Sequence, residues 1–189
     1  IISSSPVGGV WSADNANVSL SFSGATCTVN GIVAGTSTLS YMLGTGCYRT
    51  GVVTINETPA TITGPSALCE GSLAAYGTIT GGGAWSVSNA AVGTITAEGV
   101  FSALSAGTVT LSYSTSAGCF ATKIVTVNIL PSAISGMPSV CTGNATLLSS
   151  TTPGGTWSAS NSLVGLVAAG TACTVSGLGS GTSIITYSL

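Results

Sequence analysis

The stretch Gly81-Gly-Gly-Ala-Trp85-Ser-Val-Ser-Asn-Ala-Ala-Val-Gly-Thr-Ile-Thr decides the organisation of this chain, because it occurs three times. Its tryptophan has counterparts at Trp11, in Gly-Gly-Val-Trp-Ser-Ala-Asp-Asn, and at Trp157, in Gly-Gly-Thr-Trp-Ser-Ala-Ser-Asn, so the motif recurs at nearly equal intervals. The 189 residues hold no other tryptophan. Self-similarity at a fixed period is typical of an array in which one folding unit is repeated.

The linkers between the repeats divide the chain. The linker at 56–59, Asn-Glu-Thr-Pro, is matched one repeat later by Asn-Ile-Leu-Pro at 128–131. We therefore expect a complete unit B at 58–131, flanked by unit A at 1–57 and unit C at 132–189. Aligned on the tryptophans, unit A lacks its first strand and unit C lacks its last.

Short segments of unit B that are rich in Val, Ile, Thr and Tyr, separated by Gly and Ser, predict β-strands. In the segment 108–113, alternation places Val109, Leu111 and Tyr113 on one face of a strand. No window shows helical spacing, and glycine, with 27 residues, is too frequent for long helices. We predict seven strands in unit B, near residues 60–69, 73–79, 84–88, 92–96, 100–104, 108–114 and 119–129.

Seven short strands with frequent turns predict an all-β fold of tandem immunoglobulin-like antiparallel β-sandwich domains, the outer two incomplete in this chain. The repeated tryptophan fits a core position between the two sheets, because a large ring can fill the space there. A platform for stacking sugars is the alternative for this ring. A β-solenoid is the alternative architecture, since chains rich in Ser, Thr and Gly also build those.

The composition excludes several classes of function. Charged residues make up 3% of the chain, where soluble domains have roughly 25%. With Arg49 and Lys123 as the only basic residues, we expect no nucleic-acid partner. No apolar run approaches the roughly 20 residues that span a bilayer, so we expect no membrane insertion. The net charge of −2 leaves little repulsion between molecules and favours association.

We expect no enzymatic activity and no catalytic residues. The chain has no histidine, which excludes Ser-His-Asp and Cys-His nucleophile arrangements. The four acids, Asp14, Glu57, Glu70 and Glu98, lie at unrelated phases of the repeat. They do not predict the carboxylate pair of a glycoside hydrolase. We likewise expect no cofactor and no metal site.

Six cysteines without histidine or Cys-x-x-Cys spacing favour disulfides over zinc, and disulfides imply an oxidising, extracellular compartment. Cys69 and Cys119 form the one complete repeated pair within a unit. In a seven-strand sandwich their positions lie at opposite poles, so a bond within the unit requires a short first strand. A bond between neighbouring units is the geometric alternative.

Cys27 and Cys173 occupy a third phase of the repeat, where alignment on the later tyrosines places Gly99 of unit B. Cys27 has two candidate partners, Cys47 nearby in the sequence and a cysteine of another chain. The disulfide connectivity therefore stays open.

The run from Gly83 to Tyr113, Gly-Ala-Trp-Ser-Val-Ser-Asn onward, resembles bacterial immunoglobulin-like group 2 domains. The added motifs Leu-Cys69-Glu-Gly and Ala-Gly-Cys119 are similar to immunoglobulin-like and PKD-like repeats of very long secreted proteins of Bacteroidota-type bacteria. The resemblance covers all three units. It implies a β-sandwich fold and an extracellular or cell-surface location.

The sequence favours a structural role, as a polymeric, disulfide-reinforced segment of an extracellular bacterial filament, stalk or adhesin. The expected partners are copies of the chain or adjoining repeats of a longer chain. We expect the same polymer to complete both ends covalently, with donor-strand exchange as the alternative. The rival function is a polysaccharide-binding module that contacts surface glycans through loops at the pole of a sandwich or through the exposed aromatics Tyr48, Phe101 and Phe120.

Overall fold

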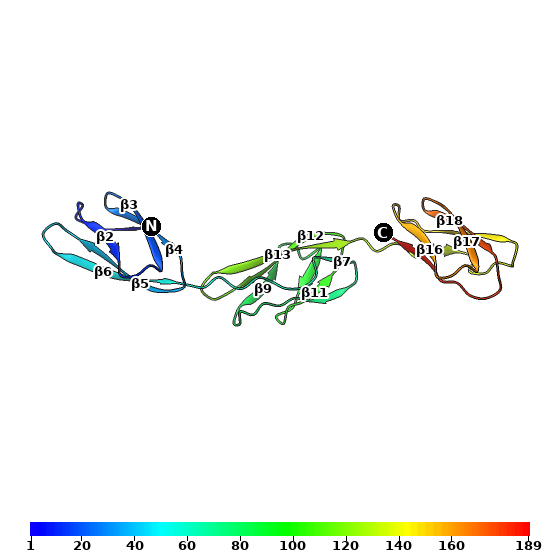
Figure 1. The fold of residues 1–189 in the computed structure, drawn as a ribbon, viewed down its shortest axis with the longest axis horizontal. Helices are drawn as coiled ribbons and strands as arrows, with labels where there is room; N and C mark the ends of the chain where they lie inside the picture. The colour runs from blue at the N-terminus through cyan, green and yellow to red at the C-terminus, as the bar shows by residue number, and fades with distance from the viewer.

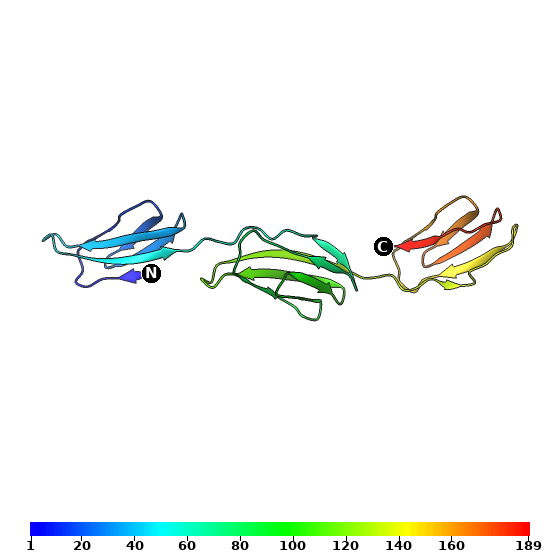
Figure 2. The ribbon, with the colours of Figure 1, turned by 90° about the horizontal axis from the view of Figure 1, so that it is seen from below.

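The computed structural model describes all 189 residues, Ile1–Leu189, and shows an all-β protein. Figures 1 and 2 show three separate β units that follow one another in a row, joined by extended linkers. Every strand pairing lies within residues 1–57, 58–131 or 132–189, so no sheet is shared between units. Each unit has two small sheets in place of the stacked rungs of a β-solenoid.

Unit B contains seven strands: β7 (Ala67–Cys69), β8 (Leu73–Ala75), β9 (Ala84–Val87), β10 (Gly93–Ile95), β11 (Val100–Ala103), β12 (Gly107–Ser114) and β13 (Phe120–Asn128). One sheet has the order β7-β13-β12-β9 and the other the order β10-β11-β8. All neighbours are antiparallel except β7 and β13, which run parallel. Two such sheets of a seven-strand unit form an immunoglobulin-like sandwich.

The predicted first strand, 60–69, is wrong as one continuous strand. Only β7 and an isolated bridge between Thr63 and Gly77 are present over this range. Gly64, with a φ of 127°, breaks the extended backbone, and a Cβ there would lie 2.5 Å from the ring of Tyr76. The other six strands of unit B are observed near their predicted positions, although β8 ends at Ala75 and not near residue 79.

The core of unit B is a cluster of ten buried residues: Ile62, Tyr76, Val92, Phe101, Ala103, Val109, Leu111, Tyr113, Val125 and Val127. The predicted inward face of β12 is confirmed, because Val109, Leu111 and Tyr113 are all buried. Trp85 packs against this cluster but remains partly exposed. Hydrophobic burial from both sheets therefore holds the unit together.

Units A and C repeat most of this order. Unit A contains β1 (Ile2–Ser3), β2 (Val10–Ala13), β3 (Val18–Ser23), β4 (Thr26–Gly31), β5 (Gly35–Met42) and β6 (Tyr48–Ile55), in sheets β1-β4-β3 and β2-β5-β6. Unit C contains β14 (Ser135–Gly136), β15 (Ala145–Ser149), β16 (Thr156–Ala159), β17 (Val164–Ala169), β18 (Ala172–Gly177) and β19 (Ile185–Ser188), in sheets β14-β15-β18-β17 and β16-β19. Unit A has no counterpart of β7, and unit C has no strand equivalent to β7 or β13.

Candidate functional site: the junctions and open edges of the units

The repeated Gly-x-Trp motif has a structural explanation. In unit B the ring centroids of Trp85 and Tyr113 lie 4.9 Å apart, and the Tyr113 hydroxyl accepts a hydrogen bond from the Gly83 N–H at 2.8 Å. A Cβ on Gly83 would lie 2.5 Å from the tyrosine ring, so only glycine fits. The same three-residue arrangement recurs as Gly9, Trp11 and Tyr41 and as Gly155, Trp157 and Tyr187.

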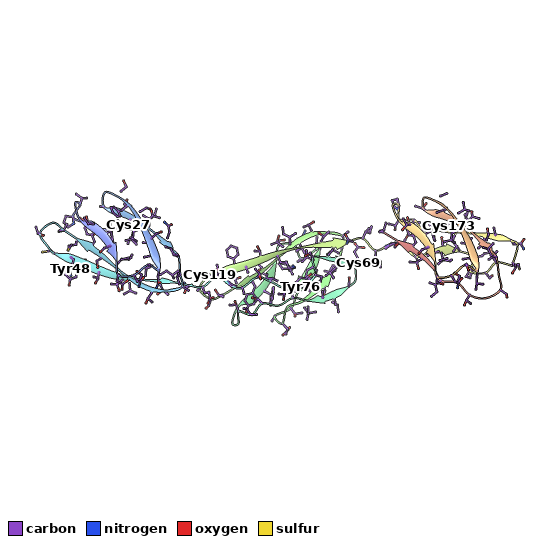
Figure 3. The ribbon with its side chains drawn as sticks, viewed as in Figure 1. Cys27, Tyr48, Cys69, Tyr76, Cys119 and Cys173 are labelled. Carbon is purple, nitrogen blue, oxygen red and sulfur yellow. The ribbon has the colours of Figure 1, made fainter.

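The aromatic residues proposed for glycan contact do not form one surface. Tyr48 and Phe120 are 66% and 62% exposed, and they open β6 and β13 in different units. Figure 3 places Tyr48 at the outer pole of unit A, away from unit B. The expectation that Phe101 is exposed is wrong. It is 0% exposed, because it points inward from β11 and packs edge-on against Tyr76 with centroids 6.0 Å apart.

The carboxylates serve the turns in which they lie. Asp14 accepts hydrogen bonds from the Thr38 N–H at 2.9 Å and the Ser37 hydroxyl at 3.1 Å. The backbone bond from Thr38 is the main reason why the pKa of Asp14 is lowered. A hydrogen bond from the Thr96 side chain lowers the pKa of Glu98 in the same way. No group of three or more His, Cys, Asp or Glu residues is placed to hold a metal ion.

Glu70 links the body of unit B to the linker that follows it. Its carboxylate accepts hydrogen bonds from the Ala106 N–H at 2.6 Å and the Leu130 N–H at 3.4 Å. Leu130 lies just beyond the end of β13. Sequence reasoning missed this role, because no local pattern pairs residues so far apart in the chain.

The downstream ends of both linkers are anchored alike. The Ala60 N–H donates to the Thr80 Oγ1 at 2.9 Å at the start of unit B. The Ser132 N–H donates to the Thr152 Oγ1 at 2.9 Å at the start of unit C. Positions 60 and 132 are equivalent in the repeat, as are positions 80 and 152, so the entry into each unit is a repeated feature.

Two of the six cysteines are core residues. Cys27 and Cys173 are 0% exposed, and this burial raises the pKa of both thiols. The strand register confirms that their position in the repeat is held by Gly99 in unit B: Gly177 bonds with Asn144 as Ala103 bonds with Ser72, which makes Cys173 and Gly99 equivalent. The proposed pairing of Cys27 with Cys47 is not formed.

All six cysteines are free within the chain, so the expected disulfide reinforcement is not present among them. Cys47, Cys69 and Cys141 are exposed, and Cys119 is half-buried. Figure 3 shows Cys69 at the pole of unit B that faces unit C and Cys119 at the pole that faces unit A. A bond between them within the unit is therefore excluded by distance.

Open grooves mark the incomplete cores of the outer units. A groove of about 530 Å³ in unit C is lined by Met137, Val140, Leu148 and Ile185, where β13 lies in unit B. A groove of about 460 Å³ in unit A is lined by residues that include Trp11 and by residues 49–53 of β6. The groove of unit C includes Ile185 of β19, the strand whose equivalent in unit B, β12, pairs with β13.

Comparisons with known proteins add little beyond the fold. No family model and no curated protein matches the chain. Domains 4 and 5 of the S-layer protein SbsC match at 17% identity and a TM-score of 0.24, over 65% of this chain and 70% of that one.

Two multidomain structures match at similar levels. PcdhgB3 EC1-4 matches at 10% identity and a TM-score of 0.33, over 89% of this chain and 58% of that one. The human desmocollin-1 ectodomain matches at 12% identity and a TM-score of 0.28, over 88% of this chain and 45% of that one. The chain thus spans about half the length of these two structures, and likenesses this distant establish no shared function. No helix of the chain is long and apolar enough to cross a membrane.

Proposed function

We propose that the chain is part of an extracellular, non-enzymatic structural shaft, of the filament, stalk or adhesin kind, in which tandem immunoglobulin-like units supply reach. The observation that carries this proposal is the direction in which the backbone passes through unit B. The backbone enters at the pole facing unit A and leaves at the pole facing unit C, as Figures 1 and 2 show. Units connected in this way add length along one axis.

The pairing of the first and last strands suits a unit that is pulled from both ends. β7 runs parallel to β13, with Thr126, Val127 and Asn128 in register with residues 67–69. The Thr126 N–H donates to the Ser66 carbonyl at 2.9 Å. Force applied at the two ends of the unit loads these bonds in shear, because the two strands are drawn past each other. Bonds loaded in shear break together rather than one by one.

Single-molecule stretching of the full chain tests this proposal. We expect a discrete unfolding event for unit B, at a force that falls in the Leu68→Ala variant, since Leu68 packs β7 against the core. Leu73→Ala is the matched control, because that side chain is largely exposed. Smooth extension without discrete events would contradict the shaft. So would turnover in a hydrolase panel that is lost in Glu98→Gln.

A polysaccharide-binding module is the second candidate, favoured by the exposed aromatics Tyr48 and Phe120 at equivalent positions of successive units. Stacking of a sugar ring on such a side chain is the expected contact. A glycan array would show binding that Tyr48→Ala and Phe120→Ala each reduce. An array without hits, or hits unchanged by both variants, would leave the shaft as the sole proposal.

A further inference from the structure

We propose that a disulfide joins each pair of successive complete units, and that the chain carries the two kinds of cysteine that form it. The strand-end cysteines, Cys69 and its repeat equivalent Cys141, belong to the preceding unit of such a pair. The hairpin cysteines, Cys119 and its equivalent Cys47, belong to the following unit. This inference rests on the proposed shaft only in taking units to follow one another end to end.

The strand-end cysteine lies beside the residue that ends the last strand of its own unit. In unit B, Cys69 is in register with Asn128, the final residue of β13. The N–H of Glu70 donates to the Asn128 carbonyl at 2.9 Å, which fixes the backbone next to Cys69. The Cys69 side chain is exposed. It is therefore free to meet a group from the next unit.

The hairpin cysteine lies beside the corresponding asparagine of the preceding unit. The Cys119 Sγ is 3.9 Å from the Asn56 carbonyl oxygen, across the boundary between units A and B. Asn56 follows β6 directly and is the repeat equivalent of Asn128. A strand-end cysteine and a hairpin cysteine are thus both neighbours of the same residue of the repeat. One approaches it from the preceding unit, and the other from the following unit.

The two junctions of the chain are alike, so the place of Cys69 at one junction can be compared with the place of Cys119 at the other. The linkers enter units B and C through the same 2.9 Å hydrogen bond to a threonine hydroxyl. Figures 1 and 2 show that the end of β19 lies beside the linker between units B and C, so a hairpin added after β19 would begin at this junction. Within the 189 residues each junction holds one member of the pair, Cys119 at the first and Cys69 at the second.

The remaining cysteines fit this assignment. Cys27 and Cys173 are fully buried inside their units and take no part. Bond formation needs Cα atoms within about 7 Å, so the opposite poles of a unit are too far apart, and the cysteine beside the same residue of the repeat is the candidate partner. Two thiols lose two protons and two electrons as the S–S bond forms. A disulfide oxidant, such as a small-molecule disulfide of the extracellular compartment, accepts them and becomes two thiols.

The test extends the full chain. A copy of residues 116–128 placed after Leu189 gives unit C a hairpin cysteine and a last strand, since Leu189 is the equivalent of Thr115. After incubation with oxidised glutathione, we expect the intact mass to fall by two hydrogen atoms. Peptide mapping should show Cys69 joined to the added cysteine. Cys69→Ser should abolish this bond, and the matched control Cys47→Ser should leave it intact.

A second extension tests the other junction and guards against misfolding of the first. A copy of residues 58–74 placed before Ile1 gives unit A a strand-end cysteine, which we expect to bond to Cys119. Cys119→Ser should abolish this bond. Two results would overturn the inference: free thiols at Cys69 and Cys119 in folded extended chains, or bonding of the added hairpin cysteine to Cys141 within unit C. Either leaves the stretching behaviour of unit B, and hence the proposed shaft, unaffected.

Discussion

Units B and C share the strand order of their common strands but bury very different cores. The buried cluster of unit B has ten residues, whereas that of unit C has three: Leu148, Cys173 and Val175. The Trp–Tyr pair is common to both, with centroids 4.9 Å apart in unit B and 4.8 Å in unit C. The difference lies largely in β13, which supplies Val125 and Val127 to the core of unit B and has no counterpart in unit C. The Trp–Tyr pair is therefore kept where the last strand is absent, while the last strand enlarges the core.

The largest expected effect is that of Phe101→Ala, which removes a fully buried ring from unit B. We expect a loss of about 3–5 kcal/mol in the free energy of unfolding of that unit, from lost burial and the cavity left behind. Cys173→Ala, which removes a small buried thiol from the core of unit C, should cost that unit about 1 kcal/mol. Denaturant titration followed by the fluorescence of each unit's single tryptophan, with the other two replaced by phenylalanine, measures both. Equal losses in the two units would contradict the expected difference between a buried ring and a buried thiol.

A substitution in the shared motif should affect both units equally. A Cβ at Gly83 or Gly155 would lie 2.5 Å from the ring of Tyr113 or Tyr187. Gly83→Ala and Gly155→Ala should therefore each destabilise their unit by about 1–3 kcal/mol, the range for overpacking. Gly81→Ala, which meets nothing within 4 Å, is the control. Thermal unfolding with the same single-tryptophan reporters measures both losses of stability, and clearly unequal losses would contradict this prediction.

Removal of the tyrosine hydroxyl should affect unit C more than unit B. Tyr187 donates to the Thr152 carbonyl at 2.6 Å and accepts from the Gly155 N–H at 2.9 Å, whereas Tyr113 only accepts from Gly83. Tyr113→Phe should cost about 1 kcal/mol and Tyr187→Phe about 2 kcal/mol. Denaturant midpoints give the comparison. A larger loss in unit B would show that hydrogen bonds to this hydroxyl do not set the difference.

The smallest expected difference concerns alkaline pH. Burial raises the pKa of Cys173 above its ordinary value of 9.0, and that of Tyr76 in unit B above 10.0. A raised folded-state pKa gives stability that is complete below the unfolded pKa and is lost as pH rises through the folded one. Unit C should therefore begin to lose stability above pH 9 and unit B only above pH 10. Unfolding titrations between these values test the order, and Cys173→Ala should remove the earlier loss.

The strands of unit B were predictable because their side chains alternate. Val109, Leu111 and Tyr113 point to one face at every second position, and burial of that face is the reason for the pattern. The interruption of the predicted first strand could not be predicted, because the break at Gly64 depends on its contact with the ring of Tyr76. That contact joins residues that are separate in sequence.

The burial of Phe101 has a signal in the sequence. Aligned on the tyrosines, it falls with Val29 and Val175 at one phase of the repeat, and an apolar residue at one phase of every unit indicates a core position. The junction was less accessible to sequence reasoning. The contact of Cys119 with Asn56 and the bond from Leu130 to Glu70 join residues far apart in the chain and depend on how the linkers run.

The anchored linkers also determine how closely the direction of one unit follows that of the unit before it. Between units B and C, Leu130 is held by Glu70 and Ser132 by Thr152, which leaves only Pro131 between the two anchors. Proline fixes its own φ, so little torsional freedom remains there. A flexible linker gives an end-to-end distance that grows with the square root of its length. Units whose linkers are held at both ends give an end-to-end distance that grows in proportion to the number of units. The tip of such an array therefore stays within a small volume at a defined height.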